Sequence, residues 1–180
     1  MVKLCKMQGE EMIKIYKGDI TNIDVDIVVN AANKTLLGGG GVDGAIHRKA
    51  GKELLEECKK LGGAQSGEAK ITNGYNMPCA KIIHTVGPVY RDGNHNEEVV
   101  LQNCYINSMN LAKNYLLQSG KEKISIAFPC IGTGVYHFPQ KRAAEIAIET
   151  IKKLNYENID VIFVCFLDSD YQIYQELLKK

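Results

Sequence analysis

Four consecutive glycines at 38–41 constrain this chain more than any other feature, because they separate a strand pattern from a helix pattern. The apolar run 27–29 precedes them, and helical spacing of apolar residues begins at Val42. Glycine loses more backbone freedom on folding than any other residue, so four together are costly. Such a loop is expected where the backbone itself approaches a ligand. At a strand-to-helix junction, free N–H groups and the helix dipole favour a phosphate.

Strand-like and helix-like patterns alternate along the chain, which predicts an α/β layer fold. Apolar patterns predict strands at 12–16, 27–30, 70–75, 81–86, 124–128 and 160–166. Helical spacing predicts helices at 42–61, 97–117, 139–154 and 171–178. A second glycine-containing junction, 128–139, resembles the one at 30–43. Ligands of open α/β sheets bind where such loops leave the carboxyl ends of strands, so these two loops are candidates to clamp one pyrophosphate.

Length and composition indicate one domain, 1–180, with a substantial core. The chain has 22 basic and 21 acidic residues, a net charge of +1, so bulk binding of nucleic acid is not expected. The longest apolar run, 161–167, is too short to span a bilayer, and the N-terminus lacks a signal-peptide pattern. The six cysteines lack zinc-knuckle spacing and are expected to be small buried residues in a reducing compartment. We therefore expect a cytoplasmic protein without a membrane partner.

The glycines at 39–44 also satisfy the pattern G-x-G-x-x-G of dinucleotide-binding folds. That fold needs an acidic residue about 20 residues further on, at the end of the next strand. Here the glycine-containing segment 62–67 follows the helix, and no strand ends in an acid. A nicotinamide-dependent dehydrogenase is therefore disfavoured, and the sequence contains no G-x-x-x-x-G-K-[ST] phosphate loop either.

Five motifs occur in an order that resembles the macrodomain family, and within it the MacroD-type ADP-ribosyl hydrolases. They are Gly18-Asp19-Ile20-Thr21, Asn30-Ala31-Ala32-Asn33, the glycine segment through His47, HTVGP at 84–88 and PCIGTGVY at 129–136. The resemblance spans residues 11–180. It implies a three-layer α/β/α sandwich with a central mixed sheet of about six strands. It also implies a cleft for ADP-ribose, with no cofactor and no metal.

The resemblance also implies which residues contact ADP-ribose. Asp19 matches the acceptor for the adenine amino group, and Phe166 matches an aromatic that flanks adenine. Backbone N–H groups of both glycine loops match the pyrophosphate site, which needs no lysine. The full predicted set is Asp19, Ile20, Thr21, Ala31, Ala32, Asn33, Gly38, Gly39, Gly40, Gly41, Val42, Asp43, Ile131, Gly132, Thr133, Gly134, Val135, Tyr136, His137 and Phe166.

Several of these residues also have ordinary structural interpretations. Asp19 suits an N-cap or a turn, and Phe166 suits the core. Tyr136 matches the aromatic under the distal ribose, but an ordinary loop aromatic fits too. Asn30 is expected to brace the loop. His137 stands where the family usually has glycine; narrowing the cleft, contacting substrate and pointing outward all remain open.

Asp43 and Asn33 are the predicted catalytic residues. A dianionic pyrophosphate does not call for another carboxylate nearby, so chemistry explains Asp43 better than affinity does. The structural alternative is a favourable charge at a helix N-terminus, which contributes about 0.3–1 kcal/mol. Asn33 matches the residue that hydrogen-bonds the distal ribose, which bears the scissile group. His47 lies one helical turn after Asp43 on the same face, whereas His84 lies within a strand and is expected to be structural.

The resemblance implies a hydrolase that removes mono-ADP-ribose from glutamate or aspartate esters and deacetylates O-acetyl-ADP-ribose. Asp43, Asn33 and a substrate phosphate are expected to position the attacking water without a metal. A non-catalytic reader of ADP-ribosylated proteins is the alternative. A phosphatase or nuclease would need a metal-binding acid cluster, which the motifs lack. Expected partners are ADP-ribose, mono-ADP-ribosylated proteins and O-acetyl-ADP-ribose, and we expect a monomer.

Overall fold

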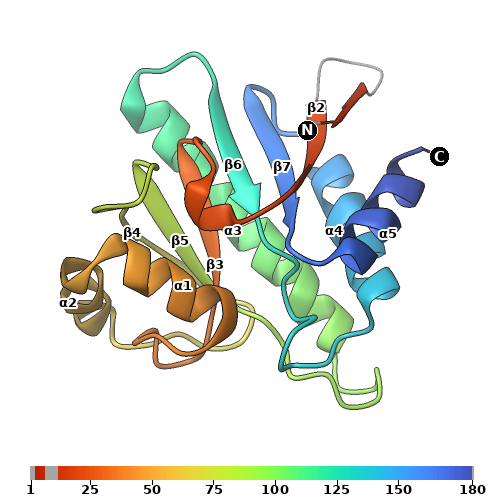
Figure 1. Cartoon of the computed structure of the whole chain (residues 1–180), viewed down its shortest axis with the longest axis horizontal. Coiled ribbons are helices and arrows are strands. Elements are labelled where there is room, and N and C mark those ends of the chain that lie inside the picture. The colour runs from red at the N-terminus through yellow and green to blue at the C-terminus, as the bar shows by residue number, and fades with distance from the viewer. Residues whose placement is uncertain (1–2, 7–11, 180) are drawn as a thin grey trace.

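The structure, a computed structural model, describes residues 3–6 and 12–179 and is drawn in Figure 1. Its strands are β1 (Lys3–Lys6), β2 (Met12–Lys17), β3 (Ile27–Ala32), β4 (Ala69–Asn73), β5 (Lys81–Val86), β6 (Ile124–Phe128) and β7 (Ile159–Cys165). Its helices are the 3-10 turn η1 (Ile20–Asn22), α1 (Gly41–Ala50), α2 (Lys52–Leu61), α3 (Glu97–Ser119), α4 (Gln140–Leu154) and α5 (Asp168–Leu178). None of these helices is long and apolar enough to cross a membrane.

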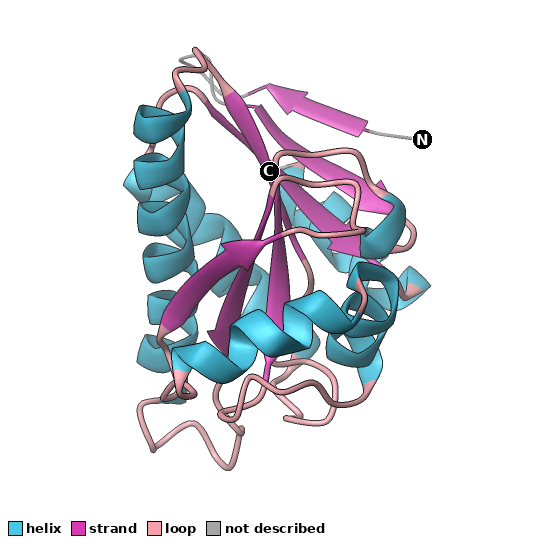
Figure 2. Ribbon diagram, turned by 90° about the vertical axis from the view of Figure 1, so that its left-hand side faces the viewer, coloured by secondary structure: helices cyan, strands magenta, loops and turns pink. Residues whose placement is uncertain are grey.

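The strands form one seven-stranded mixed sheet in the order β1-β2-β7-β6-β3-β5-β4. The five inner strands are parallel, and β1 and β4 pair antiparallel at the two edges. All five parallel strands therefore end at the same edge of the sheet. Helices lie on both sides of the sheet, as Figure 2 shows. The predicted three-layer α/β/α sandwich is confirmed, and the sheet has β1 in addition to the six strands expected from the sequence.

Two extensive hydrophobic clusters fill most of the space between the layers, beside a third and much smaller one of Ala32, Leu36, Ala64 and Val86. The larger joins the sheet to α3, α4 and α5 and contains four packed aromatic rings, those of Tyr105, Phe128, Phe163 and Tyr174. The smaller lies under α1 and α2. Val28 faces the smaller cluster and Val29 faces the larger one, so β3 is buried on both sides. This burial explains why the strand reads as a continuous apolar run rather than an alternating one.

The helix predicted at 42–61 is in fact two helices, α1 and α2, and this prediction is wrong in that respect. Gly51 separates them with φ of 94°, a conformation that side-chain-bearing residues rarely adopt. The Gly51 N–H donates to the His47 carbonyl at 3.1 Å, which closes α1. The apolar spacing continues across the break, so periodicity alone does not reveal it.

The strand predicted at 70–75 ends earlier, at Asn73. Gly74 turns the chain so tightly that a Cβ there would lie 2.1 Å from the Cys79 carbonyl oxygen. Tyr75 then adopts φ of 52°, which is not a strand conformation. The chain consequently leaves the sheet before the apolar pattern ends.

The cysteines with described side chains are all free. Cys58, Cys104 and Cys165 are buried, as expected, whereas Cys79 and Cys130 are half-buried. The side chain of Cys5 lies outside the described part of the structure, so its expected burial remains a prediction.

Candidate active site

The predicted ligand-binding residues lie at the ends of four neighbouring parallel strands or in the segments that follow them. Asp19 follows β2, Phe166 follows β7, the loop 129–138 follows β6, and the loop 33–40 follows β3. Because the sheet order is β2-β7-β6-β3, these segments lie side by side in that same order along one edge. An elongated ligand lying along this edge would meet Asp19 and Phe166 at one end and the loop before α1 at the other.

Asp19 and Phe166 are neighbours at the first end of this edge. The Gly18 N–H donates to the Cys165 carbonyl at 3.1 Å, which brings the ends of β2 and β7 together. Asp19 caps η1, because its Oδ1 accepts hydrogen bonds from Thr21 N at 2.9 Å and Thr21 Oγ1 at 2.7 Å. The N-cap interpretation is thus correct, and the exposed carboxylate has a second oxygen for a ligand. Phe166 is 74% exposed, which excludes the core interpretation.

Ile20 and Thr21, two further predicted contacts, are 5% and 6% exposed. Ile20 belongs to the hydrophobic cluster under α1 and α2, and the Thr21 hydroxyl donates its hydrogen bond to Asp19. These two side chains therefore support the end of β2 and present little surface to a ligand.

The loop after β6 is folded on itself by three short-range hydrogen bonds. Phe138 N donates to the Gly132 carbonyl at 2.8 Å, His137 N to the Gly134 carbonyl at 3.0 Å, and Thr133 Oγ1 to the Cys130 carbonyl at 3.0 Å. None of these bonds uses the backbone N–H groups of 132–136, which have no acceptor among the described residues. A row of free N–H groups in a turn favours an anion.

Side chains of this loop differ in what they offer. Ile131 is 1% exposed and belongs to the core, so only its backbone is near the edge. Val135 is 84% exposed. Tyr136 is half-buried, and its carbonyl accepts a hydrogen bond from Tyr90 N at 2.8 Å. His137 is exposed with φ of 60°, the left-handed conformation that the glycine usual at this position would adopt without strain.

The glycine loop after β3 packs directly against α1. Gly38 and Gly41 have φ of 92° and 57°, so both positions favour glycine. A Cβ on Gly44 would lie 2.4 Å from the Gly39 carbonyl oxygen, so this first helical turn also needs glycine. The N–H groups of 38–42 have no acceptor among the described residues. They form the second row of free donors on this edge, beside the N-terminus of α1.

Asn33 and Asp43 meet over this loop. A Cβ built on Gly39 would lie 3.1 Å from Asp43 Oδ2 and 3.2 Å from Asn33 Nδ2. Asn33 also braces the loop, because its Nδ2 donates to the Gly38 carbonyl at 3.0 Å and its Oδ1 accepts from Thr35. One hydrogen of Nδ2 remains for a ligand. The structure therefore brings the two predicted catalytic side chains together.

The other oxygen of Asp43 is held from inside the protein. Asn30 Nδ2 donates to Asp43 Oδ1 at 2.8 Å, and both residues are buried. Asn30 therefore braces the Asp43 side chain, whereas the sequence predicts a brace of the loop. His47 Nε2 lies 3.5 Å from Asp43 Oδ1, a distance too long for a good hydrogen bond. His47 thus lies beside Asp43 on the same face of α1, as its position one helical turn later implies, and whether it contacts a ligand stays a prediction.

Two clusters of possible metal ligands occur among the described residues. The first contains His47, Cys58 and His84, but burial and nearby carboxylates raise the pKa of Cys58 to about 11, and both ring nitrogens of His84 are hydrogen-bonded. The second contains Asp92, His95 and Glu97. The Glu97 carboxylate already accepts hydrogen bonds from four backbone N–H groups. Neither cluster offers a free set of metal ligands.

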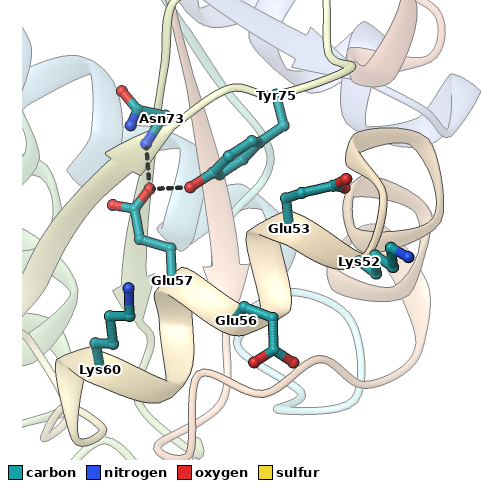
Figure 3. A pocket seen from close by; sticks show the side chains of 7 residues that line it. All are labelled: Lys52, Glu53, Glu56, Glu57, Lys60, Asn73 and Tyr75. Atoms are coloured by element: carbon teal, nitrogen blue, oxygen red, sulfur yellow. Dashed lines mark hydrogen bonds between the residues drawn. The ribbon is translucent and has the colours of Figure 1, made fainter.

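A separate groove lies between α2 and the end of β4, as Figure 3 shows. Because β4 is antiparallel, this end of the strand lies beside the amino ends of the parallel strands, opposite the glycine loops. Glu57 in this groove accepts hydrogen bonds from Asn73 N at 3.0 Å and from the Tyr75 hydroxyl at 2.7 Å. The groove is lined mainly by lysines and glutamates and lies away from both glycine loops, so it is a poor candidate for the active site.

Comparisons with known proteins identify the family of this chain. The sequence model of the Macro domain family matches residues 29–147. The chain is 49% identical over 182 residues to mouse ADP-ribose glycohydrolase MACROD2, covering 97% of this chain and 37% of that protein. It is 49% identical over 173 residues to the O-acetyl-ADP-ribose deacetylase of Escherichia fergusonii, covering 92% and 94% of the two chains. A variant of the Oceanobacillus iheyensis macrodomain solved with ADPR has 40% identity and a TM-score of 0.89, covering 99% and 97%.

The fold and the paired glycine loops define a three-layer α/β protein whose two glycine loops lie at one edge of the sheet. The chain belongs to the macrodomain family, as the family match and these relatives show. The resemblance to MacroD-type hydrolases inferred from the motifs is confirmed.

Proposed function

We propose that this chain hydrolyses esters of ADP-ribose. It removes mono-ADP-ribose from glutamate or aspartate side chains and deacetylates O-acetyl-ADP-ribose. Relatives named ADP-ribose glycohydrolase and O-acetyl-ADP-ribose deacetylase support this activity. The observation that carries the proposal is the meeting of Asp43 Oδ2 and Asn33 Nδ2 over Gly39, beside free N–H groups.

The order of the segments along the sheet edge matches the order of groups in ADP-ribose. Adenine lies against Phe166, with its amino group donating to Asp19. The pyrophosphate lies between the free N–H groups of 132–136 and 38–42. The distal ribose then reaches Asn33 and Asp43. Because backbone donors hold the phosphates, a chain of net charge +1 binds a dianion without a lysine.

The reaction adds water across the ester and releases ADP-ribose and a carboxylic acid. Asp43 Oδ2 accepts a hydrogen bond from the water, and a substrate phosphate oxygen is the second acceptor. Asn33 donates its remaining Nδ2 hydrogen to the ribose and holds the reacting carbon near that water. Rate enhancement comes from positioning with general base assistance, and loop N–H groups stabilise developing negative charge. No step of this mechanism calls for a metal.

A reader that binds ADP-ribosylated proteins without cleaving them would use the same loops. It would not need a buried carboxylate close to a dianionic ligand, since that charge weakens binding. Asp43 is 5% exposed, and one of its oxygens is fixed by Asn30 while the other lies at the space above Gly39 that Asn33 Nδ2 also approaches. This arrangement favours the hydrolase over the reader.

The test is release of ADP-ribose from a glutamate-modified protein by the natural chain and by Asp43→Ala, with and without chelator. Glu56→Ala, which removes an exposed carboxylate of the remote groove, is the matched control. We expect chelator-resistant release that Glu56→Ala keeps and Asp43→Ala loses, with ADP-ribose binding retained. Binding without release by the natural chain would establish the reader instead.

We further propose a reducing, cytoplasmic location for this chain. The support is that Cys58, Cys79, Cys104, Cys130 and Cys165 are free thiols. Alkylation and mass measurement of protein purified without reductant tests this proposal, and a disulfide among these cysteines would contradict it.

A further inference from the structure

A row of four buried polar side chains runs through the sheet to the candidate active site. It joins Thr72 in β4, His84 in β5, Asn30 in β3 and Asp43 in α1. Thr72 Oγ1 lies 2.9 Å from His84 Nε2, His84 Nδ1 lies 3.1 Å from Asn30 Nδ2, and Asn30 Nδ2 lies 2.8 Å from Asp43 Oδ1. Asn30 and His84 are direct partners in the parallel pairing of β3 with β5, so the contact follows from the strand register.

The hydrogen positions in this row are determined by its two ends. Asp43 is a carboxylate that only accepts, so Asn30 must turn its amide nitrogen toward it. The second hydrogen of that nitrogen points at His84 Nδ1, which must therefore be unprotonated. The proton of His84 lies on Nε2 and is donated to Thr72 Oγ1. Thr72 in turn donates its own hydrogen to the Asn73 carbonyl at 3.2 Å.

His84 remains neutral, so its tautomer is what matters. The residue is fully buried, and burial together with the nearby charge of His47 lowers the pKa of His84 to about 3. The His47 ring lies 6.3 Å away, centroid to centroid, and Cys58 Sγ lies 3.9 Å from His84 Nε2. Burial raises the pKa of Cys58 to about 11, so this neighbour is an uncharged thiol.

The tautomer of His84 determines which way the Asn30 amide faces. Asn30 Oδ1 is buried and has no partner among the described residues, so only Asp43 and His84 select the amide orientation. If His84 carried its proton on Nδ1, it would attract the amide oxygen instead. Rotation of the Asn30 amide would then place Asn30 Oδ1 next to Asp43 Oδ1. Two oxygen acceptors with no hydrogen between them repel each other.

We propose that His84 is a positioning residue for hydrolysis, which holds Asn30 so that Asp43 Oδ1 is fixed and Asp43 Oδ2 faces the substrate. The inference rests on the proposed function, because it assigns His84 to the same reaction. Thr72 contributes to this positioning, because its hydroxyl accepts the His84 proton and so keeps that proton on Nε2. None of the sequence motifs assigns Thr72, and the sequence alone assigns His84 a purely structural role.

The test is Thr72→Val, which keeps the shape of the side chain and removes the acceptor for the His84 proton. We expect kcat to fall roughly tenfold, as expected for a weakened buried hydrogen bond next to the reacting group. The dissociation constant for ADP-ribose and the melting temperature should change little. Thr150→Val removes a buried hydroxyl from α4, far from this row, and is the matched control. It should keep full turnover.

A double-mutant cycle separates positioning from a merely structural role. If His84 acts through Asn30, then Thr72→Val should cause no further loss of kcat when Asn30→Ala is already present. Two independent losses that multiply would overturn the proposal. So would unchanged turnover of Thr72→Val alone.

Nitrogen NMR of labelled histidine gives a readout that does not depend on turnover. The natural chain should show His84 protonated on Nε2, and Thr72→Val should show a larger share of the Nδ1 proton. A natural chain with the proton on Nδ1 overturns the inference even if it is an active hydrolase. A natural chain with the Nε2 proton but no hydrolysis of any ADP-ribose ester refutes the proposed function, and the positioning role with it.

Discussion

Asp43 Oδ2 and Asn33 Nδ2 both border the space above Gly39, 3.1 and 3.2 Å from the place where a Cβ would sit. A carboxylate oxygen and an amide nitrogen that belong to different segments thus share one small volume. Only glycine leaves that volume free for a water molecule or a ribose hydroxyl. The glycine loop therefore has two roles: it supplies free N–H groups, and at Gly39 it leaves space beside Asp43 and Asn33.

Gly39→Ala should therefore lower turnover roughly tenfold or more, because a methyl group would displace the water or one of the two side chains. The φ of Gly39 is not in the left-handed region, so alanine itself is not strained there. Gly40→Ala is the comparison, since its Cβ would meet no atom within 4 Å. Steady-state kinetics on O-acetyl-ADP-ribose should show a clearly larger loss of kcat for Gly39→Ala. Equal losses for the two variants would contradict this reading.

Asp43→Asn should abolish most hydrolysis while ADP-ribose binding stays equal or becomes tighter. Asparagine keeps the shape of the side chain and still accepts from Asn30. It removes the negative charge that orients water and that opposes the pyrophosphate. Calorimetric titration with ADP-ribose and a turnover assay measure the two effects separately. Weaker binding together with retained turnover would show that Asp43 serves affinity.

Sequence patterns predict the inner parallel strands β3, β5, β6 and β7 well, because most of their residues are buried and they read as apolar runs. Strand β3 and the two glycine junctions are examples, and the meeting of the β3 and β6 loops follows from strand order. The break at Gly51 escapes prediction, because the apolar spacing of α1 continues into α2. The row of side chains behind Asp43 escapes it for another reason. Asn30 and His84 are far apart in the sequence and become neighbours only through the register of β3 and β5.

His137→Gly should stabilise the protein by about 0.5–1 kcal/mol, because His137 has φ of 60°, a conformation that L-residues adopt at a cost. Val135→Gly in the same loop is the control: its φ is ordinary and its side chain is exposed, so glycine there only adds freedom to the unfolded chain. Urea denaturation should therefore move the two midpoints in opposite directions. A loss of stability in His137→Gly would mean that the imidazole makes a contact that compensates its strain.

Glu97 should make the fold sensitive to acid. Burial raises the pKa of its carboxylate, but backbone N–H groups of Arg91, Asp92, Gly93 and His95 outweigh burial and lower the pKa to about 2. The unfolded chain, with an ordinary glutamate, then binds the proton more readily than the folded chain. The stabilisation is complete above the ordinary pKa of 4.5 and is lost as the pH falls from there toward 2.

Glu97→Gln should consequently be less stable than the natural chain at pH 7, and its stability should fall less between pH 4.5 and pH 2. Glutamine cannot accept four N–H groups with a negative charge, so the loop 91–95 loses its anchor. Glu56→Gln, which changes an exposed acid paired with Lys59, is the matched control and should follow the natural chain at every pH. Urea midpoints measured across this pH range give the comparison. Parallel pH curves for the natural chain and Glu97→Gln would mean that the carboxylate keeps an ordinary pKa in the folded protein.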